Sequence, residues 1–283
     1  MKKLYEVRRR AVELLAKTDS DSPRADIDCL LTHIFGFTKT DIVLGVKEIS
    51  DEQAARLMSM TERLANGEPV QYITGVCEFM SMNFEVNSHT LIPRADTEVL
   101  VETVIELCRG RKNVKILEVG TGSGCIAVSL AKFIADAEVF AVDISSGALE
   151  TAKRNAEHNG VSDRVQFFSH DIMTGFPKLD FIPDAVVSNP PYIPSGDIDE
   201  LSRKVRAFEP RTALDGGSDG LDFYRKIVDI VPLRKESILA FEVGFDQSAQ
   251  VAELMKEKYS EVSVYNDLSG IGRAVIGVNK KGC

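Results

Sequence analysis

The chain has 283 residues, of which 44% are hydrophobic, and it carries a formal net charge of −9. This size and composition favour a soluble globular protein with two domains, and the apolar runs are too short to cross a bilayer. An acidic balance opposes binding driven by counterion release from nucleic acid. It therefore favours a protein or small-molecule substrate over a bare duplex.

Cysteine, histidine and N-terminal patterns give no sign of disulfides, metal binding or targeting. The five cysteines, Cys283 included, form no C-x-x-C pair, and the four histidines lack metal-ligand spacing. Basic residues near the N-terminus are interrupted by Glu6 and Glu13 and are followed by no apolar core, which favours a helix over a targeting segment. We expect a cytoplasmic monomer with reduced thiols, no metal and no membrane association.

The first third of the sequence predicts a small bundle of short helices without strands. Apolar residues recur there at helical spacing, Ser22-Pro23 is typical of a helix start, and Ser50 is a suitable cap. The expected helical segments are residues 4–17, 22–36, 40–44 and 51–65.

The sequence changes character after Asn66-Gly67-Glu68-Pro69, which breaks the helical pattern. Tyr72-Ile73-Thr74 and Phe84-Glu85-Val86 favour strands, so a hairpin or connector is expected, and residues 98–108 are again helical. We predict three parts: a helical substrate-recognition domain at 1–70, a hairpin linker at 71–92 and a catalytic domain at 93–283.

From Val114 onward, strand-like and helical segments alternate, which predicts a mostly parallel sheet with helices on both faces. The expected strands are 114–119, 138–144, 165–168, 184–188 and 238–243, and the helices between most of them are 125–135, 146–159, 222–231 and 247–258. Two final segments, 262–265 and 274–278, predict an antiparallel hairpin that closes the sheet at its edge.

Glycines follow the first of these strands, in the turn Gly120-Thr121-Gly122-Ser123-Gly124. Glycines at this place let the backbone approach a ligand closely at the carboxyl end of the sheet. A dinucleotide fingerprint requires a third glycine or alanine where Cys125 stands. Because glycine-rich turns also form for packing reasons, this pattern alone is weak evidence.

Polar residues at the next two strand ends strengthen the hypothesis. Asp143 can accept hydrogen bonds from ribose hydroxyls, although it can also simply cap the following helix. Asp171 can meet the exocyclic amine of adenine while Ile172 packs on the ring. One adenosine group can contact the residues at all three strand ends. Of the cofactors that contain adenosine, S-adenosylmethionine fits better than NAD, because the glycine turn lacks the arrangement that binds a pyrophosphate.

The tetrapeptide Asn189-Pro190-Pro191-Tyr192 directly follows the strand at 184–188. Its prolines remove two backbone donors and stiffen the turn. The Asn189 side-chain oxygen and the Pro190 carbonyl can each accept one N–H of a substrate NH2 group and aim its nitrogen at a sulfonium methyl, while Tyr192 can stack on the flat group. The turn predicts methyl transfer to a planar nitrogen without a strong general base, and the alternative is an ordinary proline-rich loop.

With these motifs the chain resembles the HemK/PrmC family, the protein-(glutamine-N5) methyltransferases that act on peptide chain release factors. The likeness covers nearly the whole chain, and its most selective segments are 91–98, Glu209-Pro210 with Ala213-Leu214, and Gly217 with Asp219-Gly220-Leu221. Further matches are 71–75, 120–127, 189–193, 267–270 and Arg273.

This resemblance implies a fold, a substrate and a cofactor. The fold is α/β: a seven-stranded Rossmann-like class I methyltransferase domain, joined by a β-hairpin linker to an N-terminal helical bundle that grips the substrate. The substrate is the glutamine of the Gly-Gly-Gln motif in class 1 release factors. The cofactor is S-adenosyl-L-methionine, which leaves as S-adenosyl-L-homocysteine. No direct binding of nucleic acid is expected.

The resemblance also implies site residues. The Ile-Pro-Arg segment closes over the methionine end of the cofactor, so Leu91, Pro93, Arg94 and Thr97 border the site, although Arg94 can also be an ordinary ion-pairing residue. Glu118 stands where the family often has aspartate and keeps a carboxylate for the cofactor's amino group. Ala95 replaces the usual proline, which loosens the loop slightly.

Three other functions are open to the sequence. A related enzyme group methylates a glutamine of a ribosomal protein, but Asp96-Thr97-Glu98 favours the release-factor group. A DNA adenine-N6 methyltransferase uses a similar tetrapeptide, but it needs a positive DNA-binding surface and base flipping. A non-catalytic binding module is disfavoured because the glycines, Asp143 and Asn189 are all present.

Overall fold

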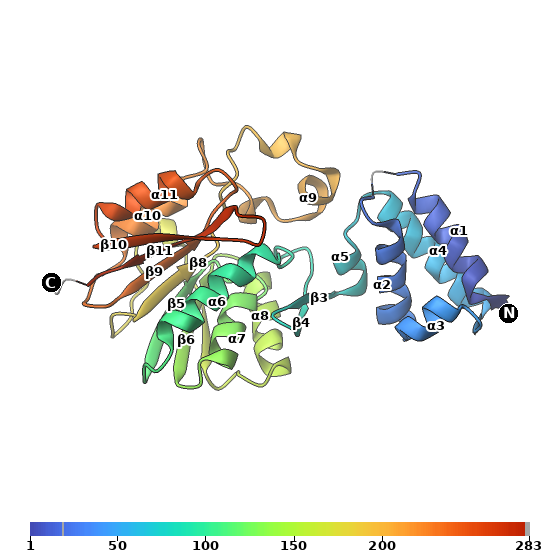
Figure 1. Cartoon of the computed structure of the whole chain (residues 1–283), viewed down its shortest axis with the longest axis horizontal. Helices are drawn as coiled ribbons and strands as arrows, with labels where there is room; N and C mark the ends of the chain where they lie inside the picture. Colours follow the sequence, from blue (N-terminus) through green and yellow to red (C-terminus); the bar gives the residue numbers. More distant parts are fainter. Residues whose placement is uncertain (19, 281–283) are drawn as a thin grey trace. The chain divides into compact units, whose positions relative to one another are not determined.

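The computed structural model describes residues 1–18 and 20–280, so Cys283 and the end of the expected catalytic range lie outside the described residues. The chain forms two compact units, Met1–Val76 with Ser202–Phe208, and Cys77–Leu201 with Glu209–Cys283 (Figure 1). Within the described part of the chain, no helix is both long and apolar enough to span a membrane. The division of labour between a recognition domain and a catalytic domain stays a prediction.

The first unit is a helical bundle with its own core, in which Leu4, Leu30 and Leu57 are fully buried. Ser50 caps one helix as predicted, in a reciprocal pair of hydrogen bonds with Gln53. The helices are α1 (Leu4–Leu15), α2 (Pro23–Phe35), α3 (Lys39–Leu44), α4 (Asp51–Ala65), α5 (Val70–Thr74) and α9 (Arg203–Phe208). A short strand pair that the sequence did not suggest joins β1 (Lys2–Lys3) to β2 (Glu48–Ile49).

The expected strand at Tyr72-Ile73-Thr74 is wrong, because these residues form helix α5. Pro69 precedes the helix with extended backbone, and Gly75 ends it in the left-handed conformation with φ of +76°. Ile73 packs in the core of the helical bundle. Tertiary burial of this apolar residue outweighs the β-propensity of its neighbours.

The hairpin predicted in the following stretch is present as β3 (Val76–Phe79) and β4 (Met82–Glu85). Phe79 and Phe84 are buried in the core of the second unit. The Asn155 side chain adds two hydrogen bonds to the backbone of Glu85, at 2.6 and 2.9 Å. The hairpin is therefore packed into the second unit rather than being a free connector.

The second unit is built on a seven-stranded sheet with the order β10-β11-β9-β8-β5-β6-β7. Strands β5 to β9 are parallel, β11 is antiparallel to β9, and β10 closes the edge as the predicted hairpin. The strands are β5 (Val114–Val119), β6 (Ala137–Asp143), β7 (Val165–Ser169), β8 (Ala185–Ser188), β9 (Ile238–Glu242), β10 (Glu261–Asn266) and β11 (Gly272–Val278). This is the predicted α/β fold.

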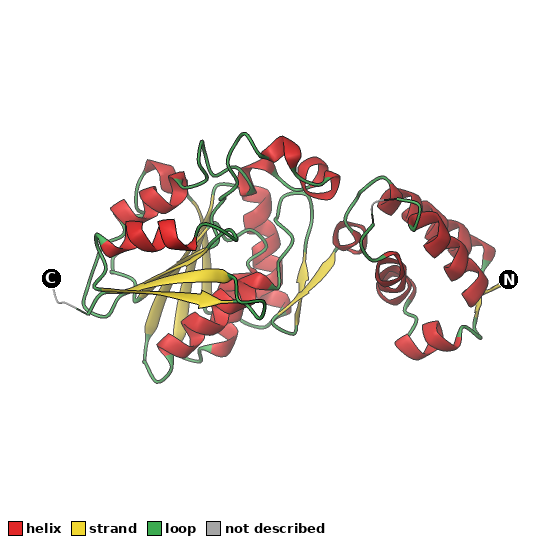
Figure 2. Cartoon of the chain, turned by 45° about the horizontal axis from the view of Figure 1, so that its top comes forward, coloured by secondary structure: helices red, strands yellow, loops and turns green. Residues whose placement is uncertain are grey.

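Helices cover both faces of this sheet (Figure 2). Along β5, Val114 and Ile116 pack on one face and Leu117 and Val119 on the other, as alternating side chains of a doubly covered strand do. One face carries α6 (Asp96–Cys108), α7 (Cys125–Phe133) and α8 (Ser146–His158), and the other carries α10 (Asp222–Ile230) and α11 (Ser248–Lys256). Short 3-10 turns are η1 (Ile172–Thr174), η2 (Ile198–Glu200) and η3 (Arg211–Ala213).

Candidate functional site

A cavity of about 390 Å³ opens where the parallel strands of the second unit end. This is the edge at which open α/β sheets bind ligands, because the chain crosses over there in opposite directions. Most of the residues predicted from the sequence line it: Leu91, Pro93, Arg94, Thr97, Glu118, Gly120, Thr121, Gly122, Ser123, Asp143, Asp171, Ile172, Asn189, Pro190 and Pro191. Gly124 and Tyr192 were predicted but are not among the lining residues.

The glycine turn after β5 forms the floor of this cavity. Gly120 and Gly122 have φ of +76° and +55°, the left-handed region that glycine adopts without strain. A Cβ built on Gly122 meets no described atom within 4 Å, because it would point into open space. The turn therefore leaves its backbone open to the cavity, and its contact with a ligand stays a prediction.

Gly124 is packed against a neighbouring helix, and its contact with a cofactor stays a prediction. It lies at the start of helix α7 with φ of +79°, and a Cβ there would stand 2.9 Å from the Cβ of Ala152. Real Cβ atoms do not approach so closely, so this glycine lets α7 pack against α8. It shapes the turn without facing the cavity.

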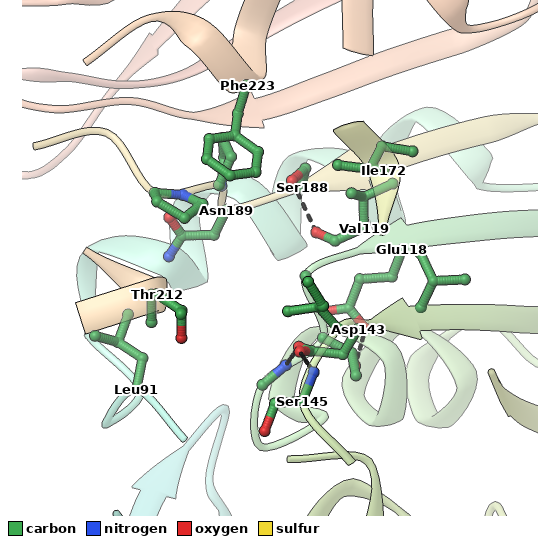
Figure 3. A pocket seen from close by; sticks show the side chains of 18 of the residues that line it. Leu91, Glu118, Val119, Asp143, Ser145, Ile172, Ser188, Asn189, Thr212 and Phe223 are labelled. Carbon is green, nitrogen blue, oxygen red and sulfur yellow. Dashed lines mark hydrogen bonds between the residues drawn. The ribbon is translucent and has the colours of Figure 1, made fainter. Parts of the chain in front are cut away.

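Asp143 ends β6 beside the glycine turn and accepts two backbone hydrogen bonds. Its Oδ2 accepts from the Gly122 N–H at 2.8 Å and its Oδ1 from the Ser145 N–H at 2.8 Å. Burial raises the pKa of Asp143, while these hydrogen bonds oppose the rise. Each oxygen keeps a further lone pair for a donor in the cavity, and Figure 3 shows the carboxylate beside Ser145.

Glu118 is a fully buried carboxyl at the back of the cavity. Its Oε2 accepts from the Thr121 hydroxyl at 2.5 Å and from the Ala127 N–H at 3.1 Å. Its Oε1 has no hydrogen-bond partner among the residues described, and the hydroxyl of Ser123 is likewise unpartnered. Burial raises the pKa of Glu118 to about 8. Two unsatisfied polar atoms at one end of the cavity indicate a ligand with polar groups there.

Asp171 and Ile172 lie at the end of β7, where the sequence placed them. The Asp171 Oδ1 accepts the Met173 N–H at 2.9 Å and caps the short turn η1, which leaves its second oxygen available. Ile172 is buried against the core of the sheet and also lines the cavity. The second Asp171 oxygen can accept a hydrogen bond from the edge of an aromatic ring, and the Ile172 side chain can pack on the face of the same ring.

The turn that begins at Asn189 lines the side of the cavity that lies across from Asp143. Just before it, the Ser188 hydroxyl donates to the carbonyl of Val119 at 2.8 Å, which ties the end of β8 to β5. The Asn189 Nδ2 donates to the Thr97 hydroxyl over a long 3.4 Å, and the Asn189 Oδ1 is buried with no partner in the described chain. Figure 3 shows Asn189 near Phe223, across from Asp143. A buried acceptor without a partner indicates that a ligand in the cavity donates a hydrogen bond to this oxygen.

Tyr192 packs against the core beside the site. It lies among the apolar residues of the face covered by α10 and α11, and burial raises its pKa to about 12. Its carbonyl accepts from the Gln247 side chain at 3.0 Å. Stacking of Tyr192 on a substrate group therefore stays a prediction that requires the ring to reach the cavity from this position.

An ion pair joins the two most selective sequence segments. Arg94 Nη2 lies 2.5 Å from Glu209 Oε1, and the Glu209 carboxyl is buried. Arg94 is thus an ion-pairing residue and also borders the cavity. The pair joins the Ile-Pro-Arg segment to the Glu-Pro segment, and Arg94 and Pro210 of these two segments both line the cavity.

Several lining residues were missed by sequence reasoning. Ile144 and Ser145 follow Asp143 directly and could have been inferred from it. Thr212 and Phe223 lie within or beside segments that were singled out, but no periodicity distinguishes them. His89 gave no signal, since its place depends on how the loop after β4 packs over Gly147.

The turn from Asn189 to Tyr192 packs closely against the backbone of Gly216. A Cβ on Gly216 would lie 2.7 Å from Tyr192 Cα and 2.8 Å from the Pro191 carbonyl oxygen. We expect Gly216→Ala to destabilise the protein by about 1–3 kcal/mol, typical of overpacking, and to lower turnover as the turn moves. Thermal unfolding and single-turnover rates test this. Gly196→Ala is the matched control, because a Cβ there meets nothing within 4 Å; identical behaviour of the two variants would contradict this packing role.

Comparison with known proteins places both units in one group. The model of the PrmC N-terminal domain matches residues 6–75, and the model of the methyltransferase small domain matches residues 85–204. Two curated relatives are named release factor glutamine methyltransferase. That of Geobacter sulfurreducens is 39% identical and covers 93% of this chain and 92% of its own. That of Moorella thermoacetica is 38% identical and covers 96% of each.

One solved structure is also similar in sequence to part of this chain. It is described as a release factor-specific protein-(glutamine-N5) methyltransferase from Alicyclobacillus acidocaldarius, and it is 33% identical to this chain. The match covers 70% of this chain and 100% of that one, with a TM-score of 0.42.

Proposed function

The chain belongs to the family of release factor glutamine methyltransferases, and from this premise we propose that it methylates N5 of the glutamine in the Gly-Gly-Gln motif of class 1 release factors. The methyl donor is S-adenosyl-L-methionine and the product is S-adenosyl-L-homocysteine. The observation that carries this proposal is the Asn189 Oδ1, a buried acceptor without a partner in the described chain. Asn189 lines the same cavity as the glycine turn.

The residues around the cavity fit an adenosyl ligand. The second lone pairs of the Asp143 oxygens suit ribose hydroxyls, and Asp171 with Ile172 suits the adenine ring. The unpartnered Glu118 Oε1 and Ser123 hydroxyl suit the polar amino-acid end. When bound, the cofactor supplies an electrophilic methyl group on its sulfonium.

The chain's own residues act by holding the substrate amide. An amide nitrogen is a poor nucleophile because its lone pair is delocalised. The Asn189 Oδ1 and the Pro190 carbonyl accept its two N–H bonds and fix the direction of the nitrogen, and they stabilise the positive charge that grows on those hydrogens during transfer. The nitrogen loses a proton after transfer, when that proton is acidic, so no strong base is needed.

Mass mapping of the product tests this proposal. The purified protein is incubated with labelled S-adenosylmethionine and a class 1 release factor, and the modified peptide is sequenced by mass spectrometry. We expect one methyl group on the glutamine of the Gly-Gly-Gln motif. Parallel reactions offer ribosomal proteins or DNA in place of the release factor. A release factor that stays unlabelled, while a ribosomal protein or the adenine of DNA takes up the label, would overturn the proposed substrate.

The helical unit is proposed to recognise the release factor. It has its own buried core and is joined to the second unit near Val76. We expect removal of residues 1–70 to reduce methylation of an intact release factor far more than methylation of a short Gly-Gly-Gln peptide, because the peptide needs only the cavity. Rates on both substrates measure this. Equal losses on the two would mean that the helical unit does not recognise substrate.

A further inference from the structure

The cavity contains an aromatic ring that the sequence did not single out. Tyr192 packs against the core and is not among the lining residues, whereas Phe223 is. Among the described residues that line the cavity, Phe223 is the one phenylalanine, and no tyrosine accompanies it. Figure 3 shows its ring beside Asn189, across the cavity from Asp143. The ring therefore lies on the side where the substrate amide is expected, and not on the side that suits a ribose.

The start of helix α10 gives Phe223 a defined position, because the residue lies in the first turn of that helix. Its half-buried side chain packs partly against the core of the sheet face that α10 covers. The next residue, Tyr224, is fully buried, and its hydroxyl donates to the Glu242 carbonyl at 2.9 Å. This buried neighbour holds the first turn of α10 against the sheet.

Two glycines before α10 allow the chain there to pack directly on the turn from Asn189 to Tyr192. A Cβ on Gly220 would overlap the Tyr192 carbonyl oxygen, and a Cβ on Gly217 would overlap the Asp222 carboxylate. Side chains at these positions would push the start of the helix away from the turn. The segment that is most selective for the family thus brings the first turn of α10 next to the turn that holds the substrate.

We propose that the ring of Phe223 packs face-on against the glutamine amide that Asn189 and the Pro190 carbonyl hold. This inference rests on the proposed function, because it concerns the same amide. Two acceptor oxygens leave a planar amide free to tilt about the line that joins them, and this tilt decides where the nitrogen lone pair points. A flat ring against one face of the amide removes that freedom.

The face of the ring also suits the charge that develops during methyl transfer. The amide nitrogen becomes positive as it takes the methyl group, and the negative face of an aromatic ring attracts a cation. This attraction is stronger in the transition state than in the bound substrate. Phe223 should therefore affect turnover more than binding.

Phe223→Leu tests this role, since leucine is apolar but has no flat face. We expect the single-turnover rate at saturating S-adenosylmethionine and Gly-Gly-Gln peptide to fall by about 3-fold to 10-fold, the effect of an aromatic contact beyond its buried area. The Kd of S-adenosylmethionine should not change. Phe223→Tyr keeps the ring and should recover most of the rate.

Phe176→Leu is the matched control. Phe176 is also half-buried against the core of this sheet face, but it does not line the cavity, so its variant should keep the wild-type rate. A Phe223→Leu variant with the wild-type rate would overturn the proposal. Weaker binding of S-adenosylmethionine with a normal rate at saturating cofactor would also overturn it, because the ring would then face the cofactor.

Ring-fluorinated phenylalanines at position 223 give a second measurement that does not depend on how well the leucine variant folds. One, two and three fluorine atoms make the face of the ring progressively less negative and change its size little. We expect the single-turnover rate to fall step by step along this series. Equal rates throughout the series would contradict a contact between the ring face and the reacting amide.

The outcomes separate this inference from the proposed function. Wild-type protein is first shown to methylate the glutamine of a release factor. If it does not, the proposed function fails before any variant is made. If it does, and the leucine and fluorinated proteins keep the wild-type rate, only the role of Phe223 is wrong. Circular dichroism of each protein confirms that it is folded.

Discussion

Asn189→Ala should lower kcat by about 10²–10³-fold, the loss seen when one preorganised hydrogen-bond partner of a transition state is removed. The reason is that the Asn189 Oδ1 is the free acceptor on the cavity wall. Its hydrogen bond to the substrate strengthens as positive charge grows on the amide, so its loss affects turnover more than binding. Rapid-quench transfer of the labelled methyl group measures kcat, and calorimetry measures the Kd of S-adenosylmethionine, which should change little.

Asn83→Ala serves as the control for this experiment. Asn83 is an exposed asparagine in β4 of the same unit, away from the residues that line the cavity. It should behave like the wild type in both measurements. If Asn189→Ala retained wild-type turnover, the turn would not hold the reacting nitrogen.

Asp143→Ala should weaken S-adenosylmethionine binding by roughly 10-fold to 150-fold, since hydrogen bonds to a charged group contribute about 1.5–3 kcal/mol. Two effects combine here. The ribose hydroxyls lose their acceptor, and the Gly122 and Ser145 N–H groups lose the carboxylate that fixes the shape of the glycine turn. Calorimetric titration with the cofactor measures the change.

Asp136→Ala is the matched control for Asp143→Ala. Asp136 is an exposed aspartate just before the opposite end of the same strand, β6. Removing its charge changes the net charge of the protein by the same amount without touching the cavity. Equal cofactor affinity in the two variants would mean that Asp143 does not hold the ribose hydroxyls.

Much of the fold could be predicted because local signals and burial agree in the second unit. Apolar runs such as Val114–Val119 alternate with amphipathic helices, and a parallel sheet is the solution that buries both. The boundaries of α4 were also predictable, because Ser50 and Gln53 form a capping box that can be read in the sequence. The segment at Tyr72 was misread, because the packing of Ile73 in the bundle is not a local property.

The sequence could predict those residues of the candidate site that lie at the ends of strands. Asp143 and Asn189 directly follow or end buried strands, so the topology alone brings them to one edge.

The position of Tyr192 illustrates a further limit of sequence reasoning. A motif indicates which side chains take part in a site. Where the turn directs each side chain depends on the close approach of Gly216 to its backbone and on the hydrogen bond from the Gln247 side chain to the Tyr192 carbonyl. The structure directs Asn189 to the cavity and packs Tyr192 beside the core.

A crystal structure of the protein with S-adenosylhomocysteine and a Gly-Gly-Gln peptide would test the central claim most directly. The account predicts that the glutamine amide nitrogen lies within hydrogen-bond distance of both the Asn189 Oδ1 and the Pro190 carbonyl oxygen, with the cofactor sulfur on the other side of that nitrogen. A peptide whose amide lies elsewhere, or a sulfur on the far side of the cavity from Asn189, would contradict it.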